Sequence, residues 1–397
     1  IRDRLNRPGE ANVPPLAVYR HAAKADSVQQ RRPNVVLIMM ESMSAKFMKH
    51  FGQSETLTPF LDSLYTRSIS FRNFYSAGIH TNHGLYATLY SFPAMMKRNL
   101  MKGSVIPRYS GLPTVLKENG YYNLFFMTHE GQYDNMNAFF RTNGYDEVFS
   151  QENYPADKVV NSFGVQDDFL YDYAIPVLNQ RAATGQPFFA TLLSISNHPP
   201  YVIPPFFHPK TSEPETQIVE YADWALRQFF EEARKQPWFD NTIFVLEGDH
   251  GKLVGDAECE LPESYNHIPL MIYSSRIQPE EKTTFGGQVD IQPTILGLLN
   301  IDYLQNNFGV DLLKEERPCM FYTADNMVVG RNDTLLYLYN YETQQELTYD
   351  IGNGKLNAVP MDDSFLPLKE YSFSMLQSAE FLVKHGKTLN SIPFTQQ

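Results

Sequence analysis

Residues 34–42 read Asn-Val-Val-Leu-Ile-Met-Met-Glu-Ser, and residues 242–251 read Thr-Ile-Phe-Val-Leu-Glu-Gly-Asp-His-Gly. Each stretch is an apolar run without alternation that ends in ionisable side chains. Such runs predict strands that are covered on both faces of a parallel sheet. Two further runs predict the same, Tyr122–Met127 before Thr128-His129-Glu130 and Phe188–Ile195 before Ser196-Asn197-His198. Because ligands of open α/β sheets bind at the carboxyl ends of strands, we expect these polar side chains to share one edge.

The segments between these runs have helical spacing of apolar residues, at Thr58–Tyr65, Thr81–Tyr90, Glu220–Glu232 and Ile291–Leu299. Alternation of strands and helices predicts an α/β fold, a doubly wound and mostly parallel sheet flanked by helices. Beyond residue 301 we expect a small antiparallel sheet plus helix, from Cys319–Thr323, Leu335–Tyr341, Glu346–Asp350 and Ser372–Gly386. The predicted organisation is an N-terminal arm (1–33), an α/β catalytic domain (34–300) and a small C-terminal α+β subdomain (301–397).

Composition excludes some classes of function. The 397 residues include 33 basic and 45 acidic side chains, a net charge of −12, which argues against nucleic-acid binding. No apolar stretch approaches the ~20 residues that cross a bilayer. The two cysteines, Cys259 and Cys319, could pair or remain as thiols.

The strand-end residues Glu41, Asp249 and His250 are candidate metal ligands. Adjacent Asp and His offer a carboxylate and an imidazole to a divalent cation, and Gly248 and Gly251 allow the backbone to turn sharply. A loop pair with ordinary hydrogen bonds is the alternative. Glu41 follows an apolar strand, where a carboxylate is costly to bury unless it is paired or metal-bound; its alternative is an acid at a helix N-terminus.

Thr81 follows the glycine-containing turn Ala77–His80 and begins a predicted helix. A hydroxyl in this position is commonly an N-cap. It becomes a nucleophile if a cation lowers its pKa, and the backbone N–H groups of the helix start would help to hold an anionic substrate.

Six motifs in this order resemble the alkaline phosphatase/sulfatase superfamily, and within it the lipoteichoic acid synthase-like branch of phosphoglycerol transferases. They are the strand leading to Glu41-Ser42, Gly78-Ile79-His80-Thr81, Asn143-Gly144-Tyr145-Asp146, Ser196-Asn197-His198-Pro199, Gly248-Asp249-His250-Gly251 and His267-Ile268-Pro269-Leu270. Each motif alone is weakly specific, whereas the ordered set, from Asn34 to about Asn300, is strongly so.

The resemblance implies roles for individual residues. Glu41, Thr81, Asp249 and His250 would bind one divalent cation, Mn²⁺ in the first place, with Zn²⁺ or Mg²⁺ as alternatives. Thr81 would be the nucleophile that becomes phosphorylated, and His198 would contact the transferred group or its leaving oxygen. His267 would contact substrate or, together with His198, a second metal; His129 and Asn82 are further candidate substrate-binding residues.

The chain departs from the family at two places. The Cys- or Ser-x-Pro-x-Arg signature of formylglycine sulfatases is absent, because Asn82-His83-Gly84-Leu85 follows Thr81. This argues against aryl-sulfate hydrolysis through a modified cysteine. The Trp and Arg that lipoteichoic acid synthases place on the headgroup are also absent from the corresponding stretch, residues 133–137.

The sequence therefore predicts a metal-dependent phosphotransferase or phosphodiesterase for a phosphoglycerol- or phosphoethanolamine-type headgroup of a lipid or glycan. A phosphate- or sulfate-ester hydrolase and a degenerate glycan- or lipid-binding protein are the alternatives. The chain begins at Ile1. By resemblance we expect a monomer on the extracytoplasmic side, periplasmic or at the outer face of the cytoplasmic membrane, anchored by a membrane segment outside this chain.

Overall fold

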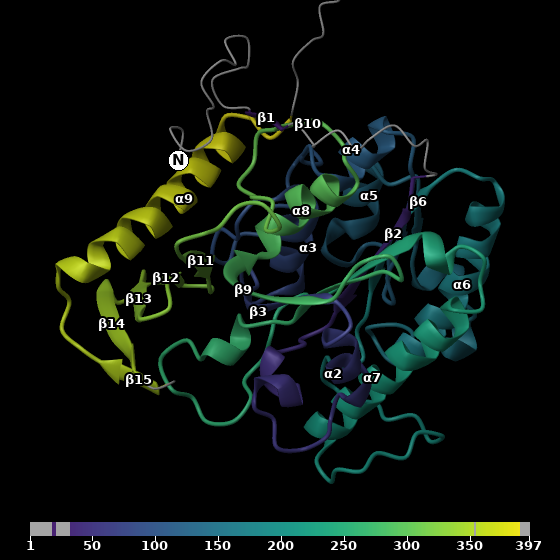
Figure 1. The fold of residues 1–397 in the computed structure, drawn as a ribbon, viewed down its shortest axis with the longest axis horizontal. Coiled ribbons are helices and arrows are strands. Elements are labelled where there is room, and N and C mark those ends of the chain that lie inside the picture. The colour runs from purple at the N-terminus through teal and green to yellow at the C-terminus, as the bar shows by residue number, and fades with distance from the viewer. Residues whose placement is uncertain (1–17, 21–31, 353–354, 390–397) are drawn as a thin grey trace, which may run out of the picture.

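The computed structural model describes residues 18–20, 32–352 and 355–389. Within them, Figure 1 shows an α/β body and, beside it, a smaller antiparallel sheet covered by one long helix. The predicted N-terminal arm lies mostly outside the described residues. Its strand β1 (Val18–Arg20) pairs with β10 (Tyr303–Gln305).

The main sheet has eight strands among the described residues, in the order β5-β4-β6-β2-β7-β8-β3-β9. All are parallel except β8, which is antiparallel to both of its neighbours. The strands are β2 (Asn34–Met40), β3 (Ile69–Tyr75), β4 (Tyr122–Phe126), β5 (Glu147–Phe149), β6 (Phe188–Leu193), β7 (Thr242–Gly248), β8 (Leu270–Tyr273) and β9 (Glu280–Gly287). The predicted mostly parallel sheet is confirmed.

Helices cover both faces of this sheet, and the central strand β2 supplies both cores. Val35, Leu37 and Met39 pack in one core, whereas the intervening side chains pack in the other. The first core contains α3 (Thr81–Tyr90), α4 (Leu112–Glu118), α5 (Met136–Thr142) and α8 (Ile291–Leu298); the second contains α2 (Pro59–Tyr65), α6 (Asp167–Ala183) and α7 (Pro214–Ala233). Burial of both faces explains why the apolar run at 34–40 has no alternation.

The smaller sheet is antiparallel, in the order β11-β12-β13-β14-β15, and helix α9 (Leu366–Lys384) packs against it (Figure 1, yellow). Its strands are β11 (Met320–Thr323), β12 (Met327–Arg331), β13 (Leu335–Asn340), β14 (Gln345–Gly352) and β15 (Lys355–Ala358). The predicted C-terminal sheet and helix are confirmed, although β12 and β15 were not predicted. Single-turn 3-10 helices lie at Ala45–Phe47, Lys49–Phe51, Tyr133–Asn135, Gln151–Asn153, Ala156–Lys158, Phe239–Asn241, Glu263–Tyr265, Gln288–Asp290 and Asp363–Phe365.

Several element boundaries differ from the sequence prediction for identifiable reasons. β6 ends at Leu193, not Ile195, because the backbone N–H groups of Ile195 and Ser196 donate to Asp167 Oδ1 at 2.9 and 3.0 Å. Helices α7 and α9 begin earlier than predicted, each with a proline in its first turn, where the missing N–H costs nothing.

The described residues answer the question of cysteine pairing and agree with the lack of a long apolar stretch in the sequence. Cys259 and Cys319 are not joined by a disulfide. Among the helices of the described residues, none combines the length and the apolar character needed to span a membrane.

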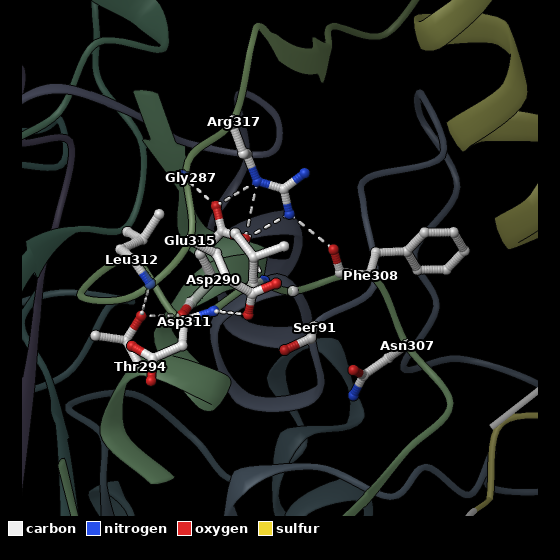
Figure 2. Close-up of polar contacts among 12 residues, drawn as sticks. Ser91, Gly287, Asp290, Thr294, Asn307, Phe308, Asp311, Leu312, Glu315 and Arg317 are labelled. Atoms are coloured by element: carbon white, nitrogen blue, oxygen red, sulfur yellow. Dashed lines mark hydrogen bonds and ion pairs between the residues drawn. The ribbon is translucent and has the colours of Figure 1, made fainter. Parts of the chain in front are cut away.

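A buried ion pair joins α8 to the segment that leads into the smaller sheet (Figure 2). Arg317 Nε donates to both carboxylate oxygens of Asp290, at 3.0 and 2.8 Å, and Nη2 donates to the Phe308 carbonyl at 2.7 Å. Asp290 also accepts from the backbone N–H groups of Gly287 and Val310. The remaining Arg317 nitrogen donates to Tyr371 on α9, so one guanidinium ties three segments together.

We expect Arg317→Met to lower the free energy of unfolding by about 3–5 kcal/mol, because it leaves the Asp290 carboxylate buried without its counter-charge. The matched control is Lys369→Met, which removes an exposed ion pair with Glu346 and should cost about 0–1 kcal/mol. Urea unfolding of both variants measures the difference. Equal, small losses would contradict the structural role of Arg317.

Candidate active site

The register between β2 and β7 creates the site. These strands pair in parallel with Met40 opposite Gly248, so the residues that follow, Glu41 and Asp249, leave the sheet side by side. The Asp249 N–H donates to the Met40 carbonyl at 3.0 Å, and the Ser42 N–H donates to Asp249 Oδ1 at 2.8 Å. Ser42 has a φ of 49°, a left-handed conformation that non-glycine residues rarely adopt and that is common at functional sites.

Glu41, Asp249 and His250 form a cluster in which one ligand atom of each side chain lies within 4.8 Å of the others. His250 Nε2 is 3.8 Å from Glu41 Oε1 and 3.6 Å from Asp249 Oδ2. Both carboxylates are buried, and Asp249 Oδ2 has no hydrogen-bond partner. Because a buried carboxylate oxygen is costly to leave unpaired, this donor set fits a divalent cation.

The orientation of His250 also fits metal binding. Its Nδ1 lies 2.7 Å from the Gly251 carbonyl, which can only accept, so Nδ1 carries the proton. Nε2 then presents its lone pair toward the two carboxylates. An imidazole held by a backbone carbonyl in this way is the common arrangement of a metal-ligating histidine.

The protonation of the cluster reflects its crowding. Burial, and then the neighbouring Asp249 carboxylate, raise the pKa of Glu41 to about 7, and His250 and Ser42 oppose the shift. Burial alone would lower the pKa of His250, but the Asp249 and Glu41 carboxylates raise it overall. Two carboxylates and an imidazole in a buried space therefore favour a bound cation over mutual repulsion.

Thr81 joins this cluster from the first turn of α3. Its Oγ1 donates to Glu41 Oε2 at 3.4 Å. Helix α3 can approach this closely because residue 84 is glycine: a Cβ there would lie 2.3 Å from the Asp249 carbonyl oxygen. Gln288 fixes the same junction, since its Nε2 donates to the Asp249 carbonyl at 2.7 Å and its Oε1 accepts from Ala77 N–H at 2.8 Å.

The end of β6 supports Glu41 from the other side. The Ser194 hydroxyl accepts from the Glu41 N–H at 3.0 Å, and Asn197 Nδ2 donates to the carbonyls of Glu41 and Ser42 at 3.2 and 3.1 Å. Asn197 Oδ1 accepts from Lys252 at 2.5 Å. The sequence analysis assigned no role to Ser194, Lys252 or Gln288. No local pattern marks Ser194 or Gln288, because each acts through contacts with segments that are distant in the sequence.

His129 follows β4 and His198 follows β6, at the same edge of the sheet. Each histidine ring contacts one aromatic ring. The His198 ring lies 4.0 Å from Phe163, and the His129 ring lies 4.5 Å from Tyr133. His198 Nδ1 is 2.6 Å from the Pro199 carbonyl, which leaves Nε2 as an acceptor. His129 is buried with Nδ1 unpartnered, and burial lowers its pKa to about 4 although Asp134 and Glu152 oppose the shift.

Asn82 and His267 differ in how their polar atoms are used. Asn82, next to Thr81, has its Oδ1 buried without a partner. His267 is occupied elsewhere: Nε2 lies 2.8 Å from the Arg72 carbonyl, Nδ1 lies 3.9 Å from Glu263, and the ring stacks on Tyr75 at 5.1 Å. In the described part of the chain, the sole group of three acidic, His or Cys side chains with metal-ligand spacing is Glu41, Asp249 and His250. No such group surrounds His198 and His267 in the described residues, and a second cation near them stays a prediction.

Comparison with known proteins agrees with this geometry. The profile of the Sulfatase family matches residues 33–301, which is more than half of the chain. The chain belongs to the sulfatase family. The matched segment includes Glu41, Thr81, Asp249 and His250, together with the strands that position them.

Two curated relatives indicate which members of the family this chain resembles. Lipoteichoic acid synthase 1 of Bacillus subtilis is 25% identical over 350 residues, which cover 81% of this chain and 53% of that protein. Phosphoglycerol transferase I of Xanthomonas campestris is 26% identical over 323 residues, 76% of this chain and 46% of that protein. The chain thus spans about half the length of these curated relatives.

Among solved structures, a protein of the alkaline phosphatase superfamily from Vibrio parahaemolyticus superposes with a TM-score of 0.84 at 27% identity, covering 96% of this chain and 93% of that one. The lipoteichoic acid synthase LtaP from Listeria monocytogenes superposes with a TM-score of 0.77 at 21% identity, covering 89% and 93%. The relationship predicted from the ordered motifs, to the alkaline phosphatase/sulfatase superfamily and its lipoteichoic acid synthase-like branch, is confirmed.

The raised pKa of Glu41 predicts how divalent-cation affinity depends on pH. A cation binds the deprotonated carboxylate, so below the pKa of about 7 a proton competes for Glu41. We expect the Mn²⁺ dissociation constant to rise at least about tenfold for each pH unit below this value and to level off once both Glu41 and His250 are deprotonated. Calorimetric titration of the metal-free protein at several pH values measures this.

Glu41→Gln is the control, because it should bind Mn²⁺ weakly at every pH with a shallower dependence that comes from His250 alone. A wild-type dissociation constant that stays flat across the pKa of Glu41 would contradict the prediction.

Proposed function

We propose that the chain is the catalytic part of a metal-dependent phosphotransferase that acts through a phosphorylated Thr81. The observation that carries the proposal is the cluster itself. A threonine hydroxyl at a helix start lies 3.4 Å from a glutamate that shares a ligand group with Asp249 and His250. A structural helix cap would need neither the buried carboxylates nor the orphaned Asp249 oxygen.

The names of the relatives support a substrate with a phosphoglycerol-type headgroup. Their names describe lipoteichoic acid synthesis and phosphoglycerol transfer, reactions that move a phosphoglycerol headgroup. We propose a phosphate diester of a lipid or glycan headgroup, phosphoglycerol- or phosphoethanolamine-type, as the donor. By the same resemblance, the protein would work outside the cytoplasm at a membrane surface.

Glu41, Asp249, His250 and Thr81 would hold the divalent cation, for which we propose Mn²⁺ first. When bound, this cation neutralises the phosphate charge and lowers the pKa of the Thr81 hydroxyl. Thr81 Oγ, whose proton passes to solvent once its pKa is lowered, attacks phosphorus, and the bond from phosphorus to the departing alcohol oxygen breaks. The N–H groups of the first turn of α3, which begins at Thr81, would stabilise the negative oxygens of the phosphoryl group.

His198 is the proposed proton carrier for both steps. Its Nδ1 is held by the Pro199 carbonyl, so Nε2 is the nitrogen that exchanges protons. As a protonated imidazolium it donates to the leaving alkoxide, and as the resulting base it takes the proton of the acceptor alcohol. The acceptor oxygen then attacks the phospho-threonine and releases Thr81. The half-buried ring of Phe163 and the exposed ring of Tyr133 flank this position, and His129 and Asn82 are proposed to contact the substrate.

Hydrolysis is the second candidate function, because water could replace the acceptor alcohol without any change in the site. The absent formylglycine signature disfavours a sulfatase of the modified-cysteine type. A degenerate binding protein is disfavoured because all four residues of the metal-and-nucleophile centre are present and close together.

We expect Thr81→Ala to bind Mn²⁺ with a modest loss of affinity and to lose turnover of phosphate diesters by several orders of magnitude, since no nucleophile remains. Incubation of the wild type with phosphatidylglycerol vesicles and Mn²⁺, followed by acid quench and peptide mass analysis, should place a phosphoglycerol adduct on Thr81.

Thr88→Ala is the control, because Thr88 lies on the same helix but donates to Glu247, outside the metal cluster. It should keep the adduct. Full turnover by Thr81→Ala, or an adduct on another residue, would refute the nucleophile assignment.

A further inference from the structure

Lys252 is a basic side chain at the edge of the metal cluster that the proposed mechanism does not use. It lies two residues after His250, and its ammonium passes between the rings of Phe47 and Tyr201, 5.3 and 4.7 Å from their centroids. It donates to Asn197 Oδ1 at 2.5 Å and to the Tyr201 hydroxyl at 3.1 Å. Both partners are neutral.

Lys252 forms no ion pair within 4.0 Å in the part of the chain that the structure describes, although the charges of Glu41 and Glu215 act on it from farther away. The ion pairs of lysine side chains in the described residues all involve other lysines. An ammonium has three donors, and its two neutral partners leave the third N–H available. A half-buried cation without a carboxylate in direct contact is costly, and an anionic ligand would lower this cost.

The contacts of Lys252 also fix its position relative to the metal ligands. Asn197 accepts from Lys252 through Oδ1 and, through Nδ2, donates to the carbonyls of Glu41 and Ser42. One amide therefore connects the ammonium to the backbone of a proposed metal ligand. A fixed cation at this place can hold an anion that also reaches the divalent cation.

The stretch at residues 133–137, which includes Tyr133 beside the site, contains no basic side chain. Residues 133–137 read Tyr-Asp-Asn-Met-Asn, without Arg or Lys. Tyr133 flanks the site, and both Tyr133 and Lys252 are close enough to Glu41 for its charge to act on them. Lys252 therefore provides a positive charge near Glu41, whereas residues 133–137 provide none.

We propose that Lys252 binds a non-bridging oxygen of the anionic phosphate group in the substrate diester, as a fixed cation beside the metal centre. This assignment rests on the proposed phosphotransferase function and makes Lys252 a substrate-binding residue. If this assignment holds, removing the charge of Lys252 weakens the binding of phosphate and leaves the binding of Mn²⁺ unchanged.

The experiment compares Lys252→Met, Lys252→Arg and the control Lys46→Met in the Mn²⁺-loaded full chain. Lys46 is a partly exposed lysine in the 3-10 helix Ala45–Phe47, and it pairs with Glu258. The dissociation constant of inorganic phosphate is measured by calorimetry, and kcat and KM are measured with bis(p-nitrophenyl) phosphate. The Mn²⁺ dissociation constant and the melting temperature are measured in parallel, with Lys252→Gln as the second variant if Lys252→Met does not fold.

We expect Lys252→Met to weaken phosphate binding and raise KM by about tenfold to a hundredfold, as loss of a charge-assisted hydrogen bond should. Lys252→Arg should recover most of the affinity, and Lys46→Met should match the wild type. Phosphate affinity unchanged in Lys252→Met, or lost only in step with Mn²⁺ affinity, would overturn the assignment. If the wild type binds phosphate but turns over no diester, the proposed function fails while the phosphate titrations still decide the role of Lys252.

Discussion

The parallel pairing of β2 with β7 is the constraint on which the site depends. Because Met40 lies opposite Gly248, the next residue of each strand is a carboxylate, and both carboxylates leave the sheet at the same level. A shift of one residue in this register would turn one of them into the sheet face and separate the ligands. Hydrogen bonds across the pair, from Asp249 N–H to the Met40 carbonyl and from Ser42 N–H to Asp249, hold the register at the point where the chemistry is proposed.

This placement is unfavourable for the protein without a cation, and the surrounding structure shows how it is maintained. Burial and the Asp249 charge raise the pKa of Glu41, so part of the repulsion is relieved by protonation. Gln288 and Asn197 then hold the backbones of Asp249 and Glu41 with side-chain amides, which carry no charge and add nothing to the repulsion. Gln288 in turn precedes Asp290, whose buried pairing with Arg317 fixes that turn (Figure 2).

The sequence was sufficient for the features that are local. The run at residues 34–40, buried on both faces, predicted β2 with its observed bounds, and the polar residues after four strands indicated the edge of the sheet. What could not be predicted depends on contacts between distant segments. The antiparallel strand β8 is a short apolar run that gives no sign of its direction. Likewise, nothing in the residues around His267 indicates that its ring is engaged by the Arg72 carbonyl, 195 positions away.

The smaller sheet, which the sequence separates from the catalytic domain, is connected to the site by a chain of contacts. Arg331 on β12 pairs with Glu263 at 2.9 Å, and Tyr75 at the end of β3 donates to the same carboxylate oxygen at 3.1 Å. The turn at residues 263–265 packs against Gly251, the residue after His250. The Gly251 N–H donates to the Tyr265 carbonyl at 2.8 Å, and a Cβ on Gly251 would lie 2.0 Å from the Ser264 carbonyl oxygen. Since the Gly251 carbonyl orients His250, an arginine of the smaller sheet acts on the imidazole through one turn of backbone. The C-terminal sheet is therefore part of the support of the proposed metal centre.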